Sequence, residues 1–153
     1  MTTNKTHITI VMADDDDDDY LLTSKALKES RLLNKLHRVK DGEELLEYLR
    51  HQDKYADQET YERPGIILLD LNMPRKDGRE ALKEIKSDPK LRNIPVVVFT
   101  TSKAEEDVYK TYELGVNSFI TKPVTFDNLI KVMQTLGTYW LEIVELPGNN
   151  DGK

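Results

Sequence analysis

The sequence contains no cysteine, which excludes a disulfide framework, a thiolate metal site and a thiol nucleophile and is compatible with a cytoplasmic location. It also lacks any apolar run approaching the ~18 residues of a membrane-spanning helix. The amino-terminal segment MTTNKTH lacks the apolar centre of a signal peptide. The net charge is −6 and the basic residues form no stripe of the kind that neutralises nucleic-acid phosphates. We therefore expect a soluble protein that binds neither membranes nor nucleic acid directly.

The 153 residues, 38% of them hydrophobic, are enough for one domain with one core and leave no room for a second folded output domain. Acidic residues number 28 and basic residues 22, and the run Asp14 to Asp19 alone accounts for the excess of six. The acidity is therefore local. We expect one domain over residues 1–147, with a helical extension from about residue 136 and a flexible tail over 148–153.

Short apolar, β-branched runs alternate with segments of helical period, which is the pattern of βα units that form a parallel sheet. Two of the runs, IILLDL and IPVVVF, are apolar on both faces, as buried central strands are. The five predicted strands are Ile8–Ala13, Leu36–Val39, Ile66–Leu71, Ile94–Phe99 and Ser118–Thr121.

Capping signals predict where helices begin. Asp41, Asp77 and Ser102 each stand three residues before a glutamate, which is the spacing of a capping box. Pro89 should end the third helix, and Gly115 is suited to a left-handed conformation after the fourth.

The spacing of apolar residues predicts which helix faces are buried. It pairs Leu22 with Ala26 in the first helix and Val108 with Tyr112 in the fourth. The last helix is predicted from Phe126 to about Glu142. The polar segment Gln52–Arg63, with Tyr55 and Tyr61, predicts a long surface loop.

Polar side chains stand at the predicted ends of several strands. Asp14 and Asp15 follow the first strand and Asp70 ends the third, while Thr100 and Lys122 stand at the ends of the fourth and fifth. The carboxyl ends of parallel strands meet along one edge, so these residues are predicted to share a pocket. If the fourth strand were shifted by one residue, Thr101 would take the place of Thr100.

Three close carboxylates repel one another unless a cation joins them, and a small set of hard oxygens suits Mg²⁺, which favours a phosphate as a further ligand. Asp70 is then the natural nucleophile for phosphoryl transfer, with Lys122 and Thr100 placed for the phosphoryl oxygens. The turn Leu71-Asn72-Met73-Pro74 would bring the backbone carbonyl of Asn72 towards the metal.

The rest of the aspartate run has a simpler interpretation, in which Asp18 or Asp19 caps the first helix or favours its positive end. An EF-hand calcium loop does not fit. A loop starting at Asp14 puts Asp19 at the turn-glycine position and Lys25 at the position of the bidentate glutamate.

Four motifs together resemble the receiver domain of two-component response regulators: the acidic pair Asp14-Asp15, LLDLNMPRKDG, PVVVFTTS and ITKP. The likeness covers about residues 6 to 135. It implies a doubly wound, flavodoxin-like α/β fold, in which a five-stranded parallel sheet has the strand order 2-1-3-4-5.

The resemblance also implies a set of roles. Asp70 would accept a phosphoryl group from a phosphohistidine of a sensor histidine kinase. Mg²⁺ would be bound by Asp15, Asp70 and the carbonyl of Asn72, with Asp14 supporting the ion through water. The protein would then catalyse only its own phosphorylation and dephosphorylation and would not be an enzyme with a separate substrate.

Further roles implied by the resemblance concern the switch. Thr100 and Lys122 would contact the phosphoryl oxygens, and Phe119 matches the aromatic residue whose ring moves inward when Thr100 is drawn to the phosphate. Because Phe119 has no hydroxyl, any such switch here depends on ring packing. The Lys122–Pro123 bond is often cis in the family.

A narrower likeness concerns the lack of an output domain, the loop at 52–63 and the ending YWLEIVELP. These features resemble the stand-alone regulators paired with bacterial phytochromes, best known from cyanobacteria. The likeness implies a light-sensing histidine kinase as phosphodonor and a homodimer formed through the last strand and helix. Tyr139 and Trp140 are either covering residues or part of such an interface.

Two other functions compete with a phosphorylation switch. An aspartate-nucleophile phosphohydrolase needs a second aspartate two residues after the nucleophile and a small hydroxyl or β-branched residue two further on. That pattern fails at Asp14, where the last position is Asp18, and at Asp70, where the second is Asn72. A passive adaptor with a vestigial pocket would leave the five polar pocket residues unexplained.

Overall fold

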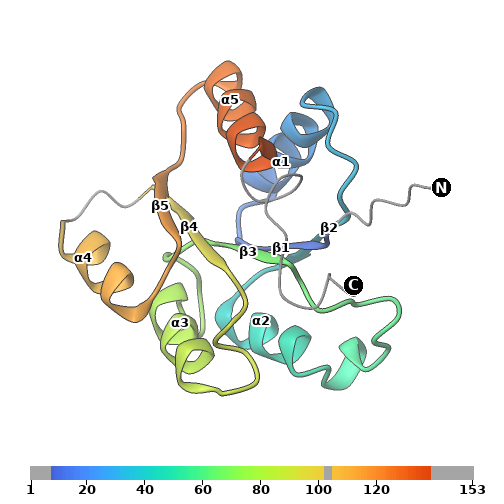
Figure 1. Ribbon diagram of the computed structural model, residues 1–153, viewed down its shortest axis with the longest axis vertical. Helices are drawn as coiled ribbons and strands as arrows, with labels where there is room; N and C mark the ends of the chain where they lie inside the picture. The colour runs from blue at the N-terminus through green and yellow to red at the C-terminus, as the bar shows by residue number, and fades with distance from the viewer. Residues whose placement is uncertain (1–7, 102–104, 139–153) are drawn as a thin grey trace.

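The computed structural model describes residues 8–101 and 105–138 and contains a twisted parallel sheet covered by helices on both faces (Figure 1). All strands are parallel, in the order β2-β1-β3-β4-β5. The predicted doubly wound fold and its strand order are confirmed. The strands are β1 (Ile10–Ala13), β2 (Leu36–Val39), β3 (Ile66–Leu69), β4 (Val96–Thr100) and β5 (Ser118–Thr121).

Helices α1 and α5 cover one face of the sheet, and α2, α3 and α4 cover the other (Figure 1). A single 3-10 turn, Asp53–Tyr55, lies in the connection between α2 and β3. The helices are α1 (Asp17–Glu29), α2 (Gly42–Leu49), α3 (Gly78–Ser87), α4 (Glu105–Leu114) and α5 (Phe126–Leu136).

Two apolar cores, one on each face, explain why the central strands are apolar throughout. Successive side chains of a strand point to opposite faces. In β3, Ile67 and Leu69 pack under α2 and α3, whereas Ile66 and Leu68 pack under α1 and α5. Every residue of β1, β3 and β4 is buried, so burial on both faces holds the carboxyl ends of these strands in place.

Most helix ends follow the predicted local chemistry. At α3, Asp77 and Glu80 form a complete capping box, and the extended backbone of Asp88 before Pro89 ends the helix. At α2, Asp41 accepts from the amide of Glu44, but the Glu44 carboxylate accepts from Lys40 instead of from the cap. Gly115 adopts the expected left-handed backbone (φ 100°), and Ser102 lies outside the described residues.

The strand ends differ from the predicted ones by two residues at most. The fourth strand begins at Val96, not Ile94, because Pro95 has no amide hydrogen to donate to a ladder. The third ends at Leu69, so Asp70 lies directly after it. Its backbone amide still donates to the carbonyl of Ala13 (3.0 Å), which ties Asp70 to the neighbouring strand.

Three predictions about burial are wrong. Leu22 is 41% exposed, and α1 buries Thr23, Ala26 and Leu27 instead. Tyr112 is exposed too, because its neighbour Thr111 is the residue of α4 that turns towards the interior. Tyr55 in the predicted surface loop is only 5% exposed.

The loop tyrosine is buried by tertiary contacts. Its ring packs against those of Tyr48 and Tyr61, with ring centres 5.2 and 4.9 Å away, and its hydroxyl donates to Glu44.

The described part of the last helix ends before the predicted end. Helix α5 runs to Leu136, where Leu129, Met133 and Leu136 form its buried stripe. The predicted continuation beyond residue 138 lies outside the described residues, as do Tyr139, Trp140 and the predicted tail. Among the helices that the structure describes, none is both long and apolar enough to cross a bilayer.

Candidate functional site

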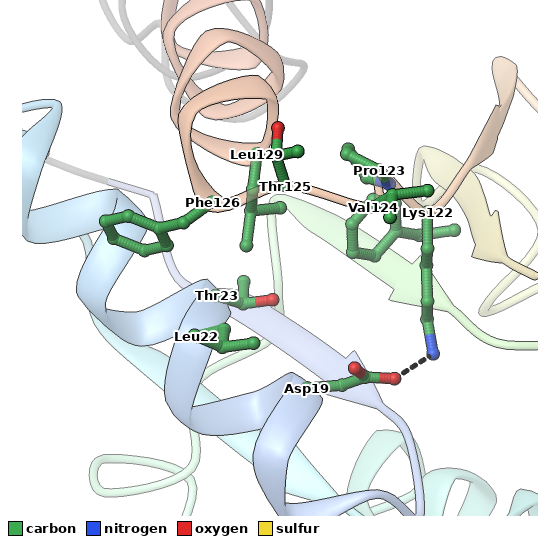
Figure 2. Close-up of a pocket in the computed structure, with 10 residues that line it drawn as sticks. Asp19, Leu22, Thr23, Lys122, Pro123, Val124, Thr125, Phe126 and Leu129 are labelled. Carbon is green, nitrogen blue, oxygen red and sulfur yellow. Dashed lines mark hydrogen bonds and ion pairs between the residues drawn. The ribbon is translucent and has the colours of Figure 1, made fainter.

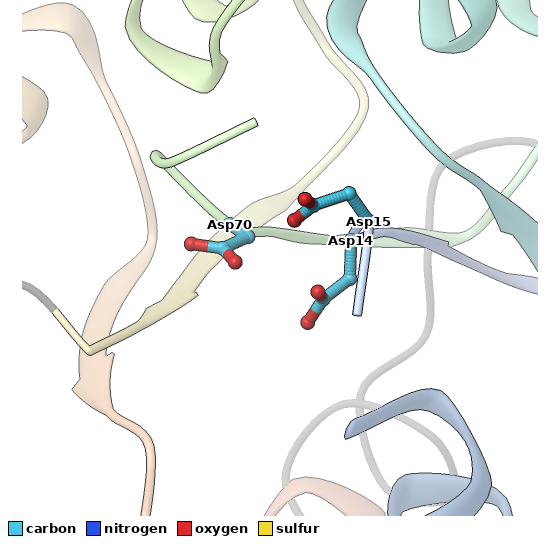
Figure 3. A group of neighbouring side chains, drawn as sticks. All are labelled: Asp14, Asp15 and Asp70. Carbon is cyan, nitrogen blue, oxygen red and sulfur yellow. The ribbon is translucent and has the colours of Figure 1, made fainter. Parts of the chain in front are cut away.

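Three carboxylates meet at the carboxyl edge of the sheet (Figure 3). Asp14 and Asp15 follow β1 and Asp70 follows β3, and each offers an oxygen atom within 4.8 Å of the others. Asp14 and Asp70 are 1% and 6% exposed, whereas Asp15 is open to solvent. The backbone amides of Asp14 and Asp70 donate to Val39 and Ala13, so sheet hydrogen bonds hold both residues in position.

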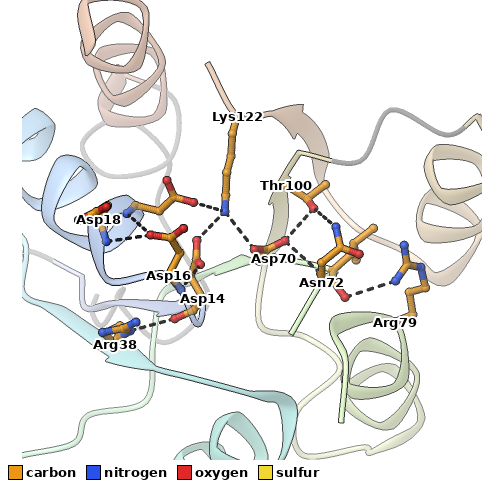
Figure 4. A network of polar contacts seen from close by, with 11 residues as sticks. Asp14, Asp16, Asp18, Arg38, Asp70, Asn72, Arg79, Thr100 and Lys122 are labelled. Carbon is orange, nitrogen blue, oxygen red and sulfur yellow. Dashed lines mark hydrogen bonds and ion pairs between the residues drawn. The ribbon is translucent and has the colours of Figure 1, made fainter. Parts of the chain in front are cut away.

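The ammonium of Lys122 reaches into the same pocket from the end of β5 (Figure 4). Its Nζ lies 2.7 Å from Asp14 Oδ2, 2.7 Å from Asp19 Oδ2 and 3.0 Å from Asp70 Oδ2. The side chain of Lys122 is 9% exposed. One largely buried cation therefore serves three carboxylates, two from the aspartate run and one from the loop after β3.

Thr100 and Asn72 contact the other oxygen of Asp70. The Thr100 hydroxyl donates to Asp70 Oδ1 (2.7 Å), and the backbone amide of Asn72 donates to the same atom (3.1 Å). The side-chain amide of Asn72 donates to the Thr100 hydroxyl at 3.5 Å. Thr100 is fully buried and Thr101 is exposed, so the register of β4 selects Thr100 of the two neighbouring threonines.

The turn that follows Asp70 depends on a glycine at the start of α3. A Cβ atom at Gly78 would lie 2.2 Å from the backbone oxygen of Asp70, closer than real atoms approach. The amide of Gly78 donates to the carbonyl of Leu71 (3.0 Å). The glycine of the LLDLNMPRKDG motif therefore lets α3 pack directly against the loop that carries Asp70 and Asn72.

The aspartate run is organised by a cap that the sequence did not identify. Asp16, not Asp18 or Asp19, caps α1, and its side chain accepts from the amides of Asp18 and Asp19. The amide of Asp16 in turn donates to Asp14 Oδ1 (2.9 Å). Asp19 is consequently fixed in the first turn of α1 and faces Lys122, a site contact missing from the predicted set.

Burial and ion pairing act in opposite directions on the pocket. Burial raises the pKa of Asp14 above its ordinary value, although the hydrogen bonds from Lys122 and from the amide of Asp16 act to lower it. For Lys122, burial alone would lower the pKa. The hydrogen bonds to Asp14 and Asp19 and the charges of Asp14 and Asp70 outweigh that effect and raise the pKa above its ordinary value.

The charges in the pocket are not balanced. Four carboxylates, those of Asp14, Asp15, Asp19 and Asp70, surround one ammonium, so three negative charges are left over. A divalent cation bound by oxygen ligands would reduce this excess, and carboxylate oxygens are ligands that Mg²⁺ prefers. The donor set therefore fits a divalent metal ion.

The remaining predicted residue, Phe119, lies in β5 and packs half-buried against the core under α2 and α3. Its backbone amide donates to the hydroxyl of Tyr112 (3.1 Å), which links β5 to α4. The Lys122–Pro123 bond is trans, contrary to the isomer that the sequence resemblance suggested.

An ion pair joins α3 to α4, and its arginine also contacts the loop after β3. The Arg79 guanidinium donates to both carboxylate oxygens of Asp107 (2.8 and 2.7 Å) and to the carbonyl of Leu71 (3.3 Å). No local sequence pattern indicates this pair, because its two residues lie 28 positions apart on different helices.

Comparison with known proteins agrees with this geometry. Residues 10–134 match the response regulator receiver domain. The response regulator Rcp1 from Synechocystis sp. is 46% identical over 126 residues, which span 82% of this chain and 84% of that protein.

Two solved structures are similar over nearly their whole length. The phosphorylated cyanobacterial phytochrome response regulator RcpA superimposes with a TM-score of 0.85 and 42% identity, covering 93% of this chain and 99% of RcpA. The Mn²⁺-bound form of Rcp1 gives a TM-score of 0.82 and 44% identity, covering 92% of this chain and 99% of Rcp1.

Proposed function

Because the chain belongs to the response regulator receiver domain family, we propose that it is a single-domain, phosphorylation-dependent switch. In this proposal Asp70 accepts a phosphoryl group from a phosphohistidine of a sensor histidine kinase in the cytoplasm. The phosphorylated protein then presents a changed surface to its partner or to a second copy of itself. The only reactions that it catalyses are its own phosphorylation and dephosphorylation.

The transfer needs a nucleophile and positive charge around the reacting phosphorus. An oxygen of Asp70 forms a bond to phosphorus as the bond from phosphorus to the histidine nitrogen breaks, and the bonding electron pair stays on that imidazole. Lys122 and Thr100, at 3.0 and 2.7 Å from Asp70, are placed to bind the phosphoryl oxygens.

Asp15, Asp70 and the backbone carbonyl of Asn72 would hold Mg²⁺. A bound Mg²⁺ would neutralise charge on the phosphoryl oxygens during transfer. Asp14 has both oxygens engaged, one by Lys122 and one by the amide of Asp16, which supports an indirect role for it through water. Asp15 is exposed and offers an oxygen within 4.8 Å of those of Asp14 and Asp70, which supports a direct role for it.

Thr100 and Phe119 would carry the signal away from Asp70. The Thr100 hydroxyl exchanges its contact with Asp70 Oδ1 for a phosphoryl oxygen, and the ring of Phe119 moves inward as Thr100 shifts. Phe119 lies in the strand next to the one that Thr100 ends. Phosphorylation would in this way change the surface formed by α4, β5 and α5.

The observation that carries the proposal is the convergence of Lys122 and Thr100 on the two oxygens of Asp70, beside two further carboxylates. Incubation with Mg²⁺ and acetyl phosphate should add the mass of one phosphoryl group to the intact protein. The Asp70→Asn variant should gain nothing. Turnover of unrelated phosphate esters would instead indicate a phosphohydrolase, and an unmodified wild-type protein would indicate a passive adaptor.

The similarity to the cyanobacterial phytochrome regulators supports a phytochrome as the phosphodonor kinase. We propose this on the likeness of the whole chain, because none of the site residues distinguishes one kinase from another. Phosphotransfer from a phytochrome histidine kinase, compared with an unrelated kinase at equal concentration, tests it. Equal rates with both kinases would contradict the assignment.

The proposal also includes a homodimer through β5 and α5. Strand β5 is an edge of the sheet, and beside it lies a hollow whose apolar lining residues are Ile120, Val132 and Leu136. A second copy of the chain would cover this apolar surface. Val132→Asp should yield a monomer in sedimentation equilibrium while keeping phosphorylation of Asp70. A wild-type protein that is monomeric both with and without beryllium trifluoride would rule out the dimer.

A further inference from the structure

The ion pair between Asp19 and Lys122 has no place in the proposed transfer, yet it is as short as the pair between Asp14 and Lys122. Figure 2 shows the Asp19 carboxylate, on the first turn of α1, directed at the Lys122 ammonium. The contact closes one end of a small cavity between α1 and the segment that leads into α5. Asp19 therefore acts on the cation that would bind a phosphoryl oxygen.

A lysine ammonium has three hydrogens to donate. In Lys122 all three are matched by acceptors, one oxygen each from Asp14, Asp19 and Asp70. A phosphoryl oxygen that binds Lys122 must consequently replace one of these contacts. The affinity of the pocket for a phosphoryl group depends on which contact is lost and what its loss costs.

Asp70 itself carries the phosphoryl group, and of the contacts with the other two carboxylates the one with Asp19 is the less costly to break. The side chain of Asp19 is 32% exposed, so water can solvate its carboxylate after release, whereas the side chains of Asp14 and Asp70 are 1% and 7% exposed. Asp19 is also held by its own backbone, since its amide donates to the cap residue Asp16. Its carboxylate therefore stays near Lys122 and can form the hydrogen bond again when the phosphoryl group leaves.

We propose that Asp19 is a positioning residue that restrains Lys122 before phosphorylation and competes with the phosphoryl oxygen for its ammonium. The inference rests on the proposed function, because it assumes that Lys122 binds the phosphoryl group. It assigns to the aspartate run a second role besides metal binding. The strength of the Asp19 contact then sets how tightly the pocket holds a phosphoryl group.

The test is a titration of the protein with beryllium trifluoride, a phosphoryl mimic, at saturating Mg²⁺, followed by ¹⁹F NMR. In Asp19→Asn the amide oxygen accepts a weaker hydrogen bond than the carboxylate, so affinity for the mimic should rise about threefold to tenfold. Asp18→Asn is the matched control. It removes the same charge from an exposed neighbour on α1 and should change the affinity by less than about twofold.

Two further readouts separate restraint from a merely structural role. The ¹⁹F shift of the fluorine next to Lys122 should move in Asp19→Asn and not in Asp18→Asn. Asp19→Glu, which restores the carboxylate, should return the affinity towards the wild-type value. Damage to the fold would lower the affinity for the mimic together with the Tm, opposite to the expected rise.

Each alternative outcome overturns the inference in a recognisable way. If the wild-type protein binds the mimic and Asp19→Asn matches Asp18→Asn, Asp19 does not restrain Lys122 and the proposed function is untouched. If Asp19→Asn binds the mimic more weakly than the control, Asp19 assists the site instead of competing with it. If the wild-type protein binds no mimic at saturating Mg²⁺, the proposed function fails and the inference fails with it.

Discussion

Replacing Lys122 with methionine tests the electrostatic account of the pocket most directly. The substitution keeps the unbranched stem of the side chain and removes the ammonium. Asp14 and Asp70, both buried, then lose the cation that lies 2.7 and 3.0 Å from them. The variant should therefore unfold at a lower urea concentration than the wild type when no divalent cation is present.

The size of the loss follows from burial. Removing one partner of a buried ion pair costs about 3–5 kcal/mol. Asp19 is about one-third exposed and Asp15 is exposed, so water screens both and we expect a loss of about 3 kcal/mol. Protonation of Asp14 limits the loss: at neutral pH, neutralising a carboxyl of ordinary pKa costs only about 4 kcal/mol. A domain of ordinary stability, about 5–15 kcal/mol, stays folded after such a loss.

The loss should depend on pH with a definite sign. Burial already raises the pKa of Asp14, and without Lys122 that pKa rises further. A carboxyl whose pKa is raised by folding costs nothing below its ordinary pKa of 3.8, and its cost grows as the pH rises towards the folded-state pKa. The deficit of Lys122→Met relative to the wild type should therefore be small in acid and largest at neutral pH.

Urea unfolding followed by circular dichroism, in EDTA and at two pH values, measures this deficit. Lys131→Met, the same substitution on the exposed side of α5, should cost less than about 0.5 kcal/mol. Mg²⁺ at a hundred times its Kd stabilises a protein by about 2.7 kcal/mol, and the gain should be larger in Lys122→Met because no ammonium repels the ion. If Lys122→Met is as stable as Lys131→Met in EDTA at neutral pH, the reasoning is refuted.

Three other perturbations test separate parts of the structure. Saturating Mg²⁺ should raise the Tm of the wild type and of Asp18→Asn in differential scanning fluorimetry, whereas Asp15→Asn should lose most of the rise. An equal rise in Tm for Asp15→Asn and Asp18→Asn would contradict the metal assignment. Thr100→Val should lower the free energy of unfolding in urea by about 1.5–3 kcal/mol, because buried Asp70 loses its 2.7 Å donor, and Thr100→Ser should recover most of it. Asp41→Ala should cost about 1 kcal/mol through loss of the cap of α2, with an unchanged m value, and no change in the urea midpoint would contradict that role.

Much of the pocket could be predicted because its geometry follows from periodicity. Apolar runs locate strands, parallel strands end at one edge, and Asp14, Asp70 and Thr100 stand at those ends. An error of two residues at the start of a strand does not matter, since the site uses only the carboxyl ends. The predictions of a capping box at Asp77 and of a left-handed Gly115 are also correct, because each depends only on neighbouring residues.

Asp19 could not be identified from the sequence because six successive aspartates offer six equivalent caps. The choice of Asp16 is made by contacts outside the run. Arg38 on β2 donates to the carbonyl of Asp14 and to the carboxylate of Asp17, which fixes the chain just before α1. The start of α1 must be known before Asp19 can be placed on the side of the helix that faces Lys122.

The buried tyrosine of the loop over residues 52–63 escaped prediction for a similar reason. Its sequence neighbours are polar, so local hydropathy indicates solvent. Burial of Tyr55 comes from two other aromatic rings and from Glu44, and these lie on α2 and further along the loop. Long-range packing of this kind overrides the local pattern.

Thr100 and Lys122, the two residues proposed to bind the phosphoryl oxygens, are linked through the backbone. This link would carry a small change at Asp70 to the far end of β5. Thr100 pairs with Thr121 across the β4–β5 ladder, and the amide of Lys122 donates to the carbonyl of Thr100 (2.8 Å). A phosphoryl group that draws both side chains would therefore pull on one hydrogen-bonded unit. Phe119 lies in β5, three residues before Lys122, so its packing would respond to the shift without any direct contact with the phosphate.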